Sequence, residues 1–348
     1  MRRDDEDNLQ PECYRAGMMS LFSSKKPEFA IDFGTANVRV VHRSEGILFD
    51  EPSLCCFTGP FGAEQLLAAG KTAWAMLDRT PSHMRIKHPL RRGVLQDIDA
   101  ATHMLRYALR SSMGRTRLGG TRVLIGVPAD ATQAERAALL TATSDAGIGA
   151  VRLVPEPLAA AVGAELPIER PAGTMIVECG AGTSEVAVIS LGGICRTRSV
   201  RVGGASLSRA IADDLHLRHK LLIGDLTAER VMEEYSEVKQ NADRSASIEV
   251  KGRSLLTQMP AALSLSSTEL DLVAEKHFRV IIDAVRQLLS ETPPELSHDI
   301  LVDGIVLTGG GALSPLLGSL MSQETGLAVR IAVDTRDCVV KGLQAMLH

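Results

Sequence analysis

The chain has 348 residues, a formal net charge of −4 and a hydrophobic content of 45%, so it can form two domains of ordinary size with substantial cores. Its slightly acidic balance argues against a nucleic-acid partner held by phosphate attraction, and an aromatic content of 3% leaves few side chains to stack on single-stranded bases. No apolar run is long enough to span a membrane, and the N-terminal MRRDDEDN lacks the apolar segment of a signal peptide. The six cysteines show no metal-binding spacing, which favours reduced, buried thiols in a cytosolic protein.

Residues 1–27 are predicted to form an N-terminal extension. Residues 1–12 are charged and show no periodicity, whereas the segment after them places apolar residues between basic ones. This segment can form a short amphipathic helix on an anionic membrane, or it can pack as a linker against the domain edge. Its apolar residues are Met18, Met19, Leu21 and Phe22, and its basic residues are Arg15, Lys25 and Lys26.

Residues 29–41, FAIDFGTANVRVV, predict a β-hairpin with Asp32 near the end of the first strand and Gly34 in the loop. Residues 174–190, TMIVECGAGTSEVAVIS, repeat the pattern, with Glu178 and Gly180 in the places of Asp32 and Gly34. Such glycines let backbone N–H groups converge on a phosphate, and the carboxylate can hold a metal ion against it. The repeat favours two related halves facing each other across a nucleotide over two unrelated hairpins.

Between the hairpins, residues 45–90 are predicted to be irregular, with short strands and a helix near residues 63–77. An amphipathic helix is expected at residues 99–111, a basic surface loop at 111–120 and a buried strand at 122–127. Thr132 and Glu135 form a capping-box pattern that begins the next helix, and a strand follows at residues 150–154.

Glu156 lies between two prolines directly after this strand. Pro157 suits the first helical position, so Glu156 is expected just outside a helix N-terminus. Chemistry in α/β sheets is placed at such strand ends, where Glu156 could orient a water that attacks a terminal phosphate. A simpler role for the carboxylate is to stabilise the helix dipole.

After the second hairpin, helices are predicted from residue 207, at residues 225–239 and at residues 266–289, with a strand at 247–250. A buried strand at residues 305–308 then runs into Gly309, Gly310 and Gly311. Backbone without side chains would let a flat ring lie against the chain, and the helix start that follows favours an anion. A strand at residues 328–332 and a helix at 338–347 complete the expected elements.

Together these motifs resemble the actin/heat-shock-70/sugar-kinase superfamily and, within it, the MreB family of bacterial actin homologues. IDFGTANVRV and VECGAGTSEVAVISLGG resemble the two phosphate loops, and VPEPLAAAVGAELP resembles the segment with the catalytic glutamate. GDLTAERV and IVLTGGGALSPLLGSLMSQETG resemble the adenosine-contacting segments. The resemblance covers residues 18–348 in one order and at the family's spacings.

The resemblance implies an α/β fold with actin-like (ribonuclease H-like) duplicated domains around a nucleotide cleft, each with a smaller subdomain insertion. Domain I would span residues 28–165 with an insertion at about 43–80, and domain II would span residues 166–325 with an insertion at about 205–262. Residues 326–348 would return to domain I.

The resemblance also implies ATP and Mg²⁺ as cofactors. Asp32 and Glu178 would hold the metal, and Glu156, Asp32 and Thr183 would be the catalytic residues. The nucleotide would be bound by Gly34, Thr35, Ala36, Asn37, Gly180, Ala181, Gly182, Thr183, Gly204, Glu229, Met232, Gly309, Gly310, Gly311 and Ala312.

The function implied is that of an ATP-binding cytoskeletal protein with slow hydrolysis coupled to polymerisation. Its partners would be further copies of itself in antiparallel double protofilaments, the inner face of the cytoplasmic membrane and membrane proteins of cell-wall elongation. Such filaments guide cell-wall synthesis and determine rod shape. A nucleic-acid partner is not expected.

Four positions depart from the family pattern. Glu178 stands where the family has aspartate, and its extra methylene would disturb the geometry that Mg²⁺ demands. Ala181 interrupts the usual three glycines, and Ala205 and Met232 replace an aspartate and a lysine. Besides slow hydrolysis, these changes leave open a pseudo-ATPase scaffold that co-assembles with a standard MreB, or a filament that organises another intracellular structure. A sugar kinase of the same fold is disfavoured, since no stretch outside the nucleotide motifs indicates a polar small-molecule site.

Overall fold

A computed structural model describes residues 27–60, 62–114, 120–241 and 247–348. The predicted membrane-binding segment at Met18–Phe22 and residues 115–119 of the basic loop predicted at 111–120 lie outside the described residues. Within the described part of the chain, no helix combines the length and the hydropathy that a membrane crossing requires.

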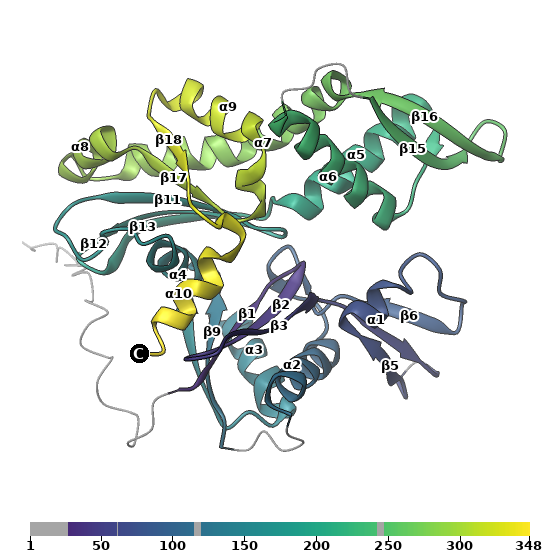
Figure 1. Ribbon diagram of the computed structural model, residues 1–348, viewed down its shortest axis with the longest axis horizontal. Coiled ribbons are helices and arrows are strands. Elements are labelled where there is room, and N and C mark those ends of the chain that lie inside the picture. Colours follow the sequence, from purple (N-terminus) through teal and green to yellow (C-terminus); the bar gives the residue numbers. More distant parts are fainter. Residues whose placement is uncertain (1–26, 61, 115–119, 242–246) are drawn as a thin grey trace, which may run out of the picture.

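Two five-stranded sheets form the centre of the molecule (Figure 1). The first has the order β10 (Ala150–Pro155), β9 (Arg122–Val127), β1 (Phe29–Phe33), β2 (Asn37–His42) and β3 (Gly46–Pro52). The second has the order β13 (Gly193–Val200), β12 (Ser184–Ser190), β11 (Thr174–Cys179), β17 (Ile305–Thr308) and β18 (Val329–Ile331). In each sheet three antiparallel strands follow one another along the chain, and two parallel strands are added beside the first of them. The shared strand order confirms that the two hairpins begin related halves.

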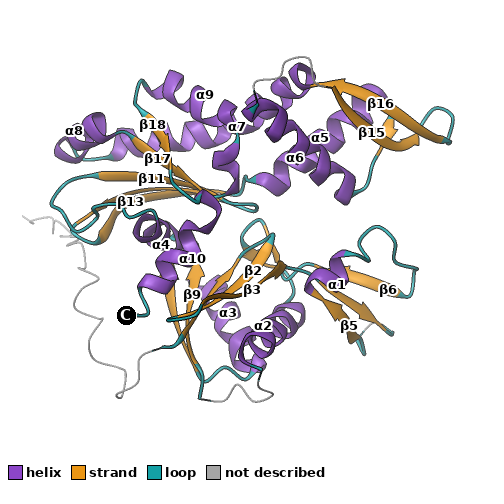
Figure 2. Ribbon diagram, viewed as in Figure 1, coloured by secondary structure: helices purple, strands orange, loops and turns teal. Residues whose placement is uncertain are grey.

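Helices cover the outer face of each sheet, which explains why the inner strands are apolar on both faces. In the first half these are α2 (Ile98–Met113) and α3 (Gln133–Ala146), and α3 begins at the predicted capping box, with Glu135 N–H donating to Thr132 Oγ1 at 3.2 Å. In the second half they include α7 (Ser267–Glu291), α8 (Pro294–Asp303) and α9 (Pro315–Thr325). Figure 2 shows these helices flanking the strands.

Each half also carries a small sheet. In the first half β4 (Cys55–Thr58) lies between β5 (Gln65–Ala69) and β6 (Met84–Lys87), beside the short helix α1 (Gly70–Trp74). The helix predicted near residues 63–77 is therefore mostly wrong, because Gln65–Ala69 pairs with β4 as a strand. In the second half β14 (Leu221–Leu222), β15 (Ser247–Ser254) and β16 (Pro260–Ser266) pack with α5 (Gly204–His219) and α6 (Asp225–Gln240).

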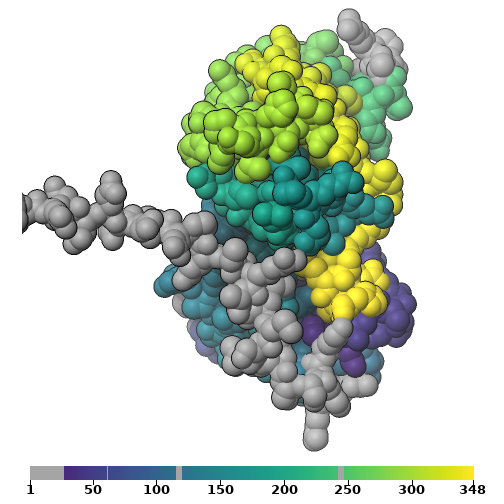
Figure 3. All heavy atoms as spheres, turned by 90° about the vertical axis from the view of Figure 1, so that its left-hand side faces the viewer, coloured from purple at the N-terminus to yellow at the C-terminus, as the bar shows by residue number. Residues whose placement is uncertain are grey.

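Helices α4 (Glu156–Gly163) and α10 (Cys338–Ala345) lie between the two large sheets and pack on each other. One buried cluster joins Leu124 of the first sheet, Ile176 of the second, Ala160 of α4 and Val340 of α10. In Figure 3 the C-terminal residues, in yellow, run from the upper half down to the lower half. Because β18 still belongs to the second sheet, we propose that the return to domain I begins after Ile331.

The crossing of α4 and α10 depends on two glycines. A Cβ on Gly342 would overlap the carbonyl oxygen of Ala159, and a Cβ on Gly163 would overlap that of Cys338. We expect Gly342→Ala to lower the free energy of unfolding by about 1–3 kcal/mol, the usual cost of overpacking a core. Urea denaturation followed by circular dichroism measures this change.

The matched control is Gly318→Ala in α9. A Cβ at Gly318 would lie 3.8 Å from Leu307 Cδ1, an ordinary contact. This variant should be as stable as the parent chain or slightly more stable, because alanine favours a helix. Equal stability of the two variants would contradict a close backbone contact at the helix crossing.

Candidate functional site

A cavity of about 750 Å³ lies between the two halves and is lined by residues of both. Both predicted phosphate loops line it, together with Glu156 and the three glycines at residues 309–311. Gly204 of α5 and Glu229 and Met232 of α6 line it as well. The structure therefore brings the predicted site residues together, with one exception. Ala312 does not line the cavity, because it is fully buried in the core of the second half.

The two hairpin loops have the same local structure. Gly34 N–H donates to Asn37 O at 3.0 Å, and Gly180 N–H donates to Thr183 O at 2.9 Å. A Cβ would come within 2.9 Å of the acceptor in the first loop and 3.2 Å in the second. A side chain would crowd both turns, more tightly at Gly34 than at Gly180, and the sequence echo is confirmed as a structural one.

The loops also touch each other across the cavity. A Cβ on Gly182 would overlap Thr35 Oγ1 and would lie 2.7 Å from the amide nitrogen of Gly93. That amide donates to Thr35 Oγ1 at 3.1 Å from the tight turn between β7 (Leu90–Arg91) and β8 (Val94–Leu95). The first loop, the second loop and this turn therefore form one continuous wall.

Three further contacts join the two halves around the cavity. Ala129 N–H donates to Glu185 Oε1 at 2.8 Å, and Arg201 pairs with Glu135 at 3.2 Å. At the small sheets, Leu226 N–H at the start of α6 donates to Asp78 Oδ2 at 3.1 Å. These contacts connect the two halves on either side of the cavity.

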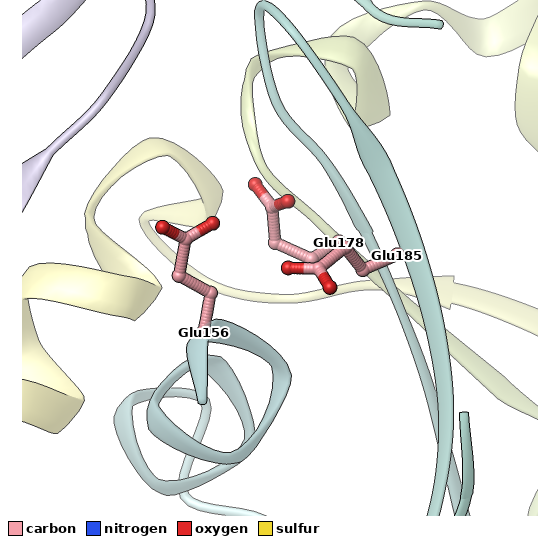
Figure 4. Close-up of side chains that lie close together, drawn as sticks. All are labelled: Glu156, Glu178 and Glu185. Atoms are coloured by element: carbon pink, nitrogen blue, oxygen red, sulfur yellow. The ribbon is translucent and has the colours of Figure 1, made fainter. Parts of the chain in front are cut away.

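Two glutamates of the cavity wall, Glu156 and Glu178, lie close to a third, the fully buried Glu185 (Figure 4). Glu156 is the first residue of α4, and Glu178 and Glu185 are direct partners across the β11–β12 hairpin. One carboxylate oxygen of each lies within 4.8 Å of the others. Glu185 was not predicted from sequence, although its register opposite Glu178 follows from the hairpin.

Glu185 is fixed by its surroundings. Its Oε1 accepts hydrogen bonds from Ala129 N–H and Ser199 Oγ–H, each at 2.8 Å. Its Oε2 is buried and has no hydrogen-bond partner among the described residues. A buried carboxylate oxygen without a partner is costly, so this atom is suited to a proton, a water or a cation.

Burial is the largest cause of the pKa shifts of the carboxyl groups in the site. It raises the pKa of Asp32 to about 6 and that of Glu185 to about 7. Burial, reinforced by the neighbouring carboxylates, raises the pKa of Glu156 and of Glu178 well above 4.5. Oxygen ligands with excess buried negative charge suit a hard divalent cation such as Mg²⁺.

We expect the melting temperature of the chain in EDTA to fall as the pH rises from about 6.5 to about 8, above the range in which His88, His103 and His277, whose pKa values are lowered by burial, act in the opposite direction. The pKa values of folded Asp32 and Glu185, about 6 and about 7, exceed their ordinary values of 3.8 and 4.5. The folded state therefore binds more protons in this range, and its extra stability, complete below about pH 4, is lost as the pH rises through about 7. Scanning calorimetry at several pH values measures the trend, and Mg²⁺ at the highest pH should reverse it. A melting temperature that rises with pH in EDTA would contradict the buried acidic cluster.

In the turn at residues 309–311, packing accounts for two of the three glycines. Gly309 has φ +81°, and a Cβ there would overlap the carbonyl oxygen of Cys179. A Cβ on Gly311 would lie 2.8 Å from Cys179 Cβ, whereas nothing lies within 4 Å of one on Gly310. Of the three glycines, only Gly310 has no packing contact that excludes a side chain, so close approach of a ligand is the remaining explanation for it.

Helix α6 lines the opposite end of the cavity. Met232 Sδ accepts a hydrogen bond from Ser208 Oγ–H at 3.2 Å. Burial, with the neighbouring Glu233 and Asp225, raises the pKa of Glu229 to about 6. This end therefore offers the Met232 thioether where the family pattern has a lysine, beside the partly buried carboxyl group of the predicted Glu229.

The comparisons with known proteins agree with this architecture. The cell shape-determining protein MreB of Escherichia coli K12 is 37% identical over 318 residues, covering 90% of this chain and 91% of the relative. The cell shape-determining protein MreB of Pasteurella multocida is 39% identical over 326 residues, covering 92% of both.

Among solved structures, MreB5 of Spiroplasma citri bound to AMPPNP superposes with a TM-score of 0.84 at 32% identity, covering 93% of this chain and 96% of that one. A second structure of MreB5 is bound to ADP. The fold of two matching halves around a cleft is therefore actin-like, as the sequence predicted. The model of the MreB/Mbl protein family matches residues 26–348, and the chain belongs to that family.

Proposed function

We propose that the chain binds ATP with Mg²⁺ in the cavity between its halves and hydrolyses it slowly during assembly into cytoskeletal filaments. The observation that carries this proposal is the pair of equivalent hairpin loops, with acids at positions 32 and 178 beside one cavity. The AMPPNP and ADP bound to MreB5, and the name that the relatives share, support it and favour a role in cell shape.

Each group of residues in the site would have its own role in binding and hydrolysis. Backbone N–H groups of the loops at residues 34–37 and 180–183 would hold the phosphates. Asp32 and Glu178 would hold Mg²⁺, which when bound neutralises charge that develops on the phosphate oxygens. Glu156, at the start of α4, would orient the attacking water and accept its proton. Glu185, whose carboxylate lies beside that of Glu156, would help to keep it in place.

Assembly and membrane attachment rest on sequence alone. We propose filaments of antiparallel double protofilaments on the inner face of the cytoplasmic membrane, attached through Met18–Phe22 and linked to proteins of cell-wall elongation. Electron microscopy of the purified chain with ATP and anionic lipid vesicles tests this. Monomers under all nucleotide and salt conditions would reject it.

A nucleotide-binding scaffold with little hydrolysis is the second candidate. Asp32 is already paired with Arg39, whose Nη1 lies 3.5 Å from Asp32 Oδ2, and Glu178 is one methylene longer than the family's aspartate. Both features oppose ideal Mg²⁺ geometry. Phosphate release above background from the purified chain, lost in Glu156→Ala, would decide for the ATPase.

A further inference from the structure

Arg39 is a charged residue of the cavity wall that the proposed function does not use. It lies on β2 directly opposite Asp32, in the same register that places Glu185 opposite Glu178 in the second half. Its side chain is 15% exposed and lines the cavity beside the loop at residues 34–37. The two halves therefore differ at an equivalent position: a cation in the first, an acid in the second.

The guanidinium of Arg39 is held from two sides. Its Nε donates to Asp50 Oδ2 at 3.2 Å, and its Nη1 donates to the carbonyl oxygen of Arg336 at 2.8 Å. Nη1 also lies 3.5 Å from Asp32 Oδ2. Asp50 is itself tied to the loop, because its Oδ1 accepts from Asn37 Nδ2–H at 2.6 Å. The charge is therefore placed beside the phosphate loop by contacts that exist without any ligand.

One nitrogen of this group is left over. Among the described residues, Nη2 of Arg39 has no hydrogen-bond partner. A guanidinium whose other nitrogens are fixed loses little side-chain freedom when it binds an anion, and the N–H groups of Nη2 can donate to a phosphate oxygen.

We propose that Arg39 binds the phosphates of the nucleotide and supplies part of the positive charge that would otherwise come only from a divalent cation. The chain then retains a nucleoside triphosphate when Mg²⁺ is removed. This inference rests on the proposed nucleotide binding, and it concerns the cation that accompanies the phosphates.

The test is the affinity of the full chain for ATP, measured by calorimetry once with Mg²⁺ and once with EDTA. Arg39→Gln should weaken binding in EDTA by about tenfold or more, since hydrogen bonds to charged groups contribute about 1.5–3 kcal/mol. In Mg²⁺ its effect should be smaller, so the ratio of the two dissociation constants rises relative to the parent chain. Arg39→Lys keeps the charge without the guanidinium that Asp50 and Arg336 hold in place, and it should give an intermediate ratio.

The control is Arg198→Gln on β13, which breaks a half-exposed ion pair with Glu291 outside the cavity and should leave the ratio unchanged. Equal ratios in the parent chain and Arg39→Gln would overturn the inference while nucleotide binding stands. Failure of the parent chain to bind ATP even with Mg²⁺ would overturn both. If circular dichroism shows Arg39→Gln unfolded, Arg39→Lys decides, and a ratio equal to that of the parent chain overturns the inference.

Discussion

Replacing Glu156 by glutamine is expected to slow ATP-dependent phosphate release by about 100-fold or more, the usual loss when a general base is removed. Glutamine keeps the size of the side chain but cannot accept the proton of the attacking water. Glu156 begins α4, and its carboxylate lies beside those of Glu178 and Glu185 (Figure 4), whereas the backbone of the loops is proposed to hold the phosphates. Nucleotide affinity should therefore change much less than the rate.

Single-turnover phosphate release and ATP titration, measured on the same preparation, separate the two effects. Glu165→Gln is the matched control, because Glu165 is an exposed residue just after the same helix. It should match the parent chain in both measurements. A Glu156→Gln variant that releases phosphate at the parent rate would remove Glu156 from the mechanism, and phosphate release at background from the parent chain itself would favour the scaffold.

The sequence predicted the parts of this site that are local in the chain. The hairpin loops depend on glycines at positions 34 and 180, which a pattern of strand, acid and glycine reveals. Glu156 is predicted in the same way from a strand end followed by Pro157. Each of these features needs only a few adjacent residues, so one sequence is sufficient.

The parts that were missed depend on pairing across strands. Arg39 and Glu185 are both seven positions after an acid that was predicted, and they face it only because the hairpin register places them there. Counting residues around the two loops would have found both. The burial of Ala312 and the packing of Gly309 and Gly311 on Cys179 depend on how β17 pairs with β11, which no local pattern reveals.

Gly182→Ala is expected to weaken ATP binding by about 10- to 100-fold. A Cβ at this position would overlap Thr35 Oγ1 of the opposite loop and would approach the amide of Gly93 to 2.7 Å. Thr35 can rotate, but the Gly93 backbone cannot, so the two loops must separate. Relieving such an overlap costs about 1–3 kcal/mol. If the phosphates contact both loops, the loops must return to their original positions when ATP binds, and the binding free energy is reduced by this amount.

Titration of the full chain with ATP and Mg²⁺ measures the loss, and Gly193→Ala provides the control. Gly193 begins β13, and a Cβ there would lie 3.9 Å from its nearest neighbour, the carbonyl oxygen of Ser190, so this variant should bind ATP like the parent chain. If one loop alone held the nucleotide, the separation of the loops in Gly182→Ala would not change the affinity for ATP. Unchanged affinity in a folded Gly182→Ala variant would therefore mean that the two hairpins do not clasp one ligand, whatever their resemblance to each other.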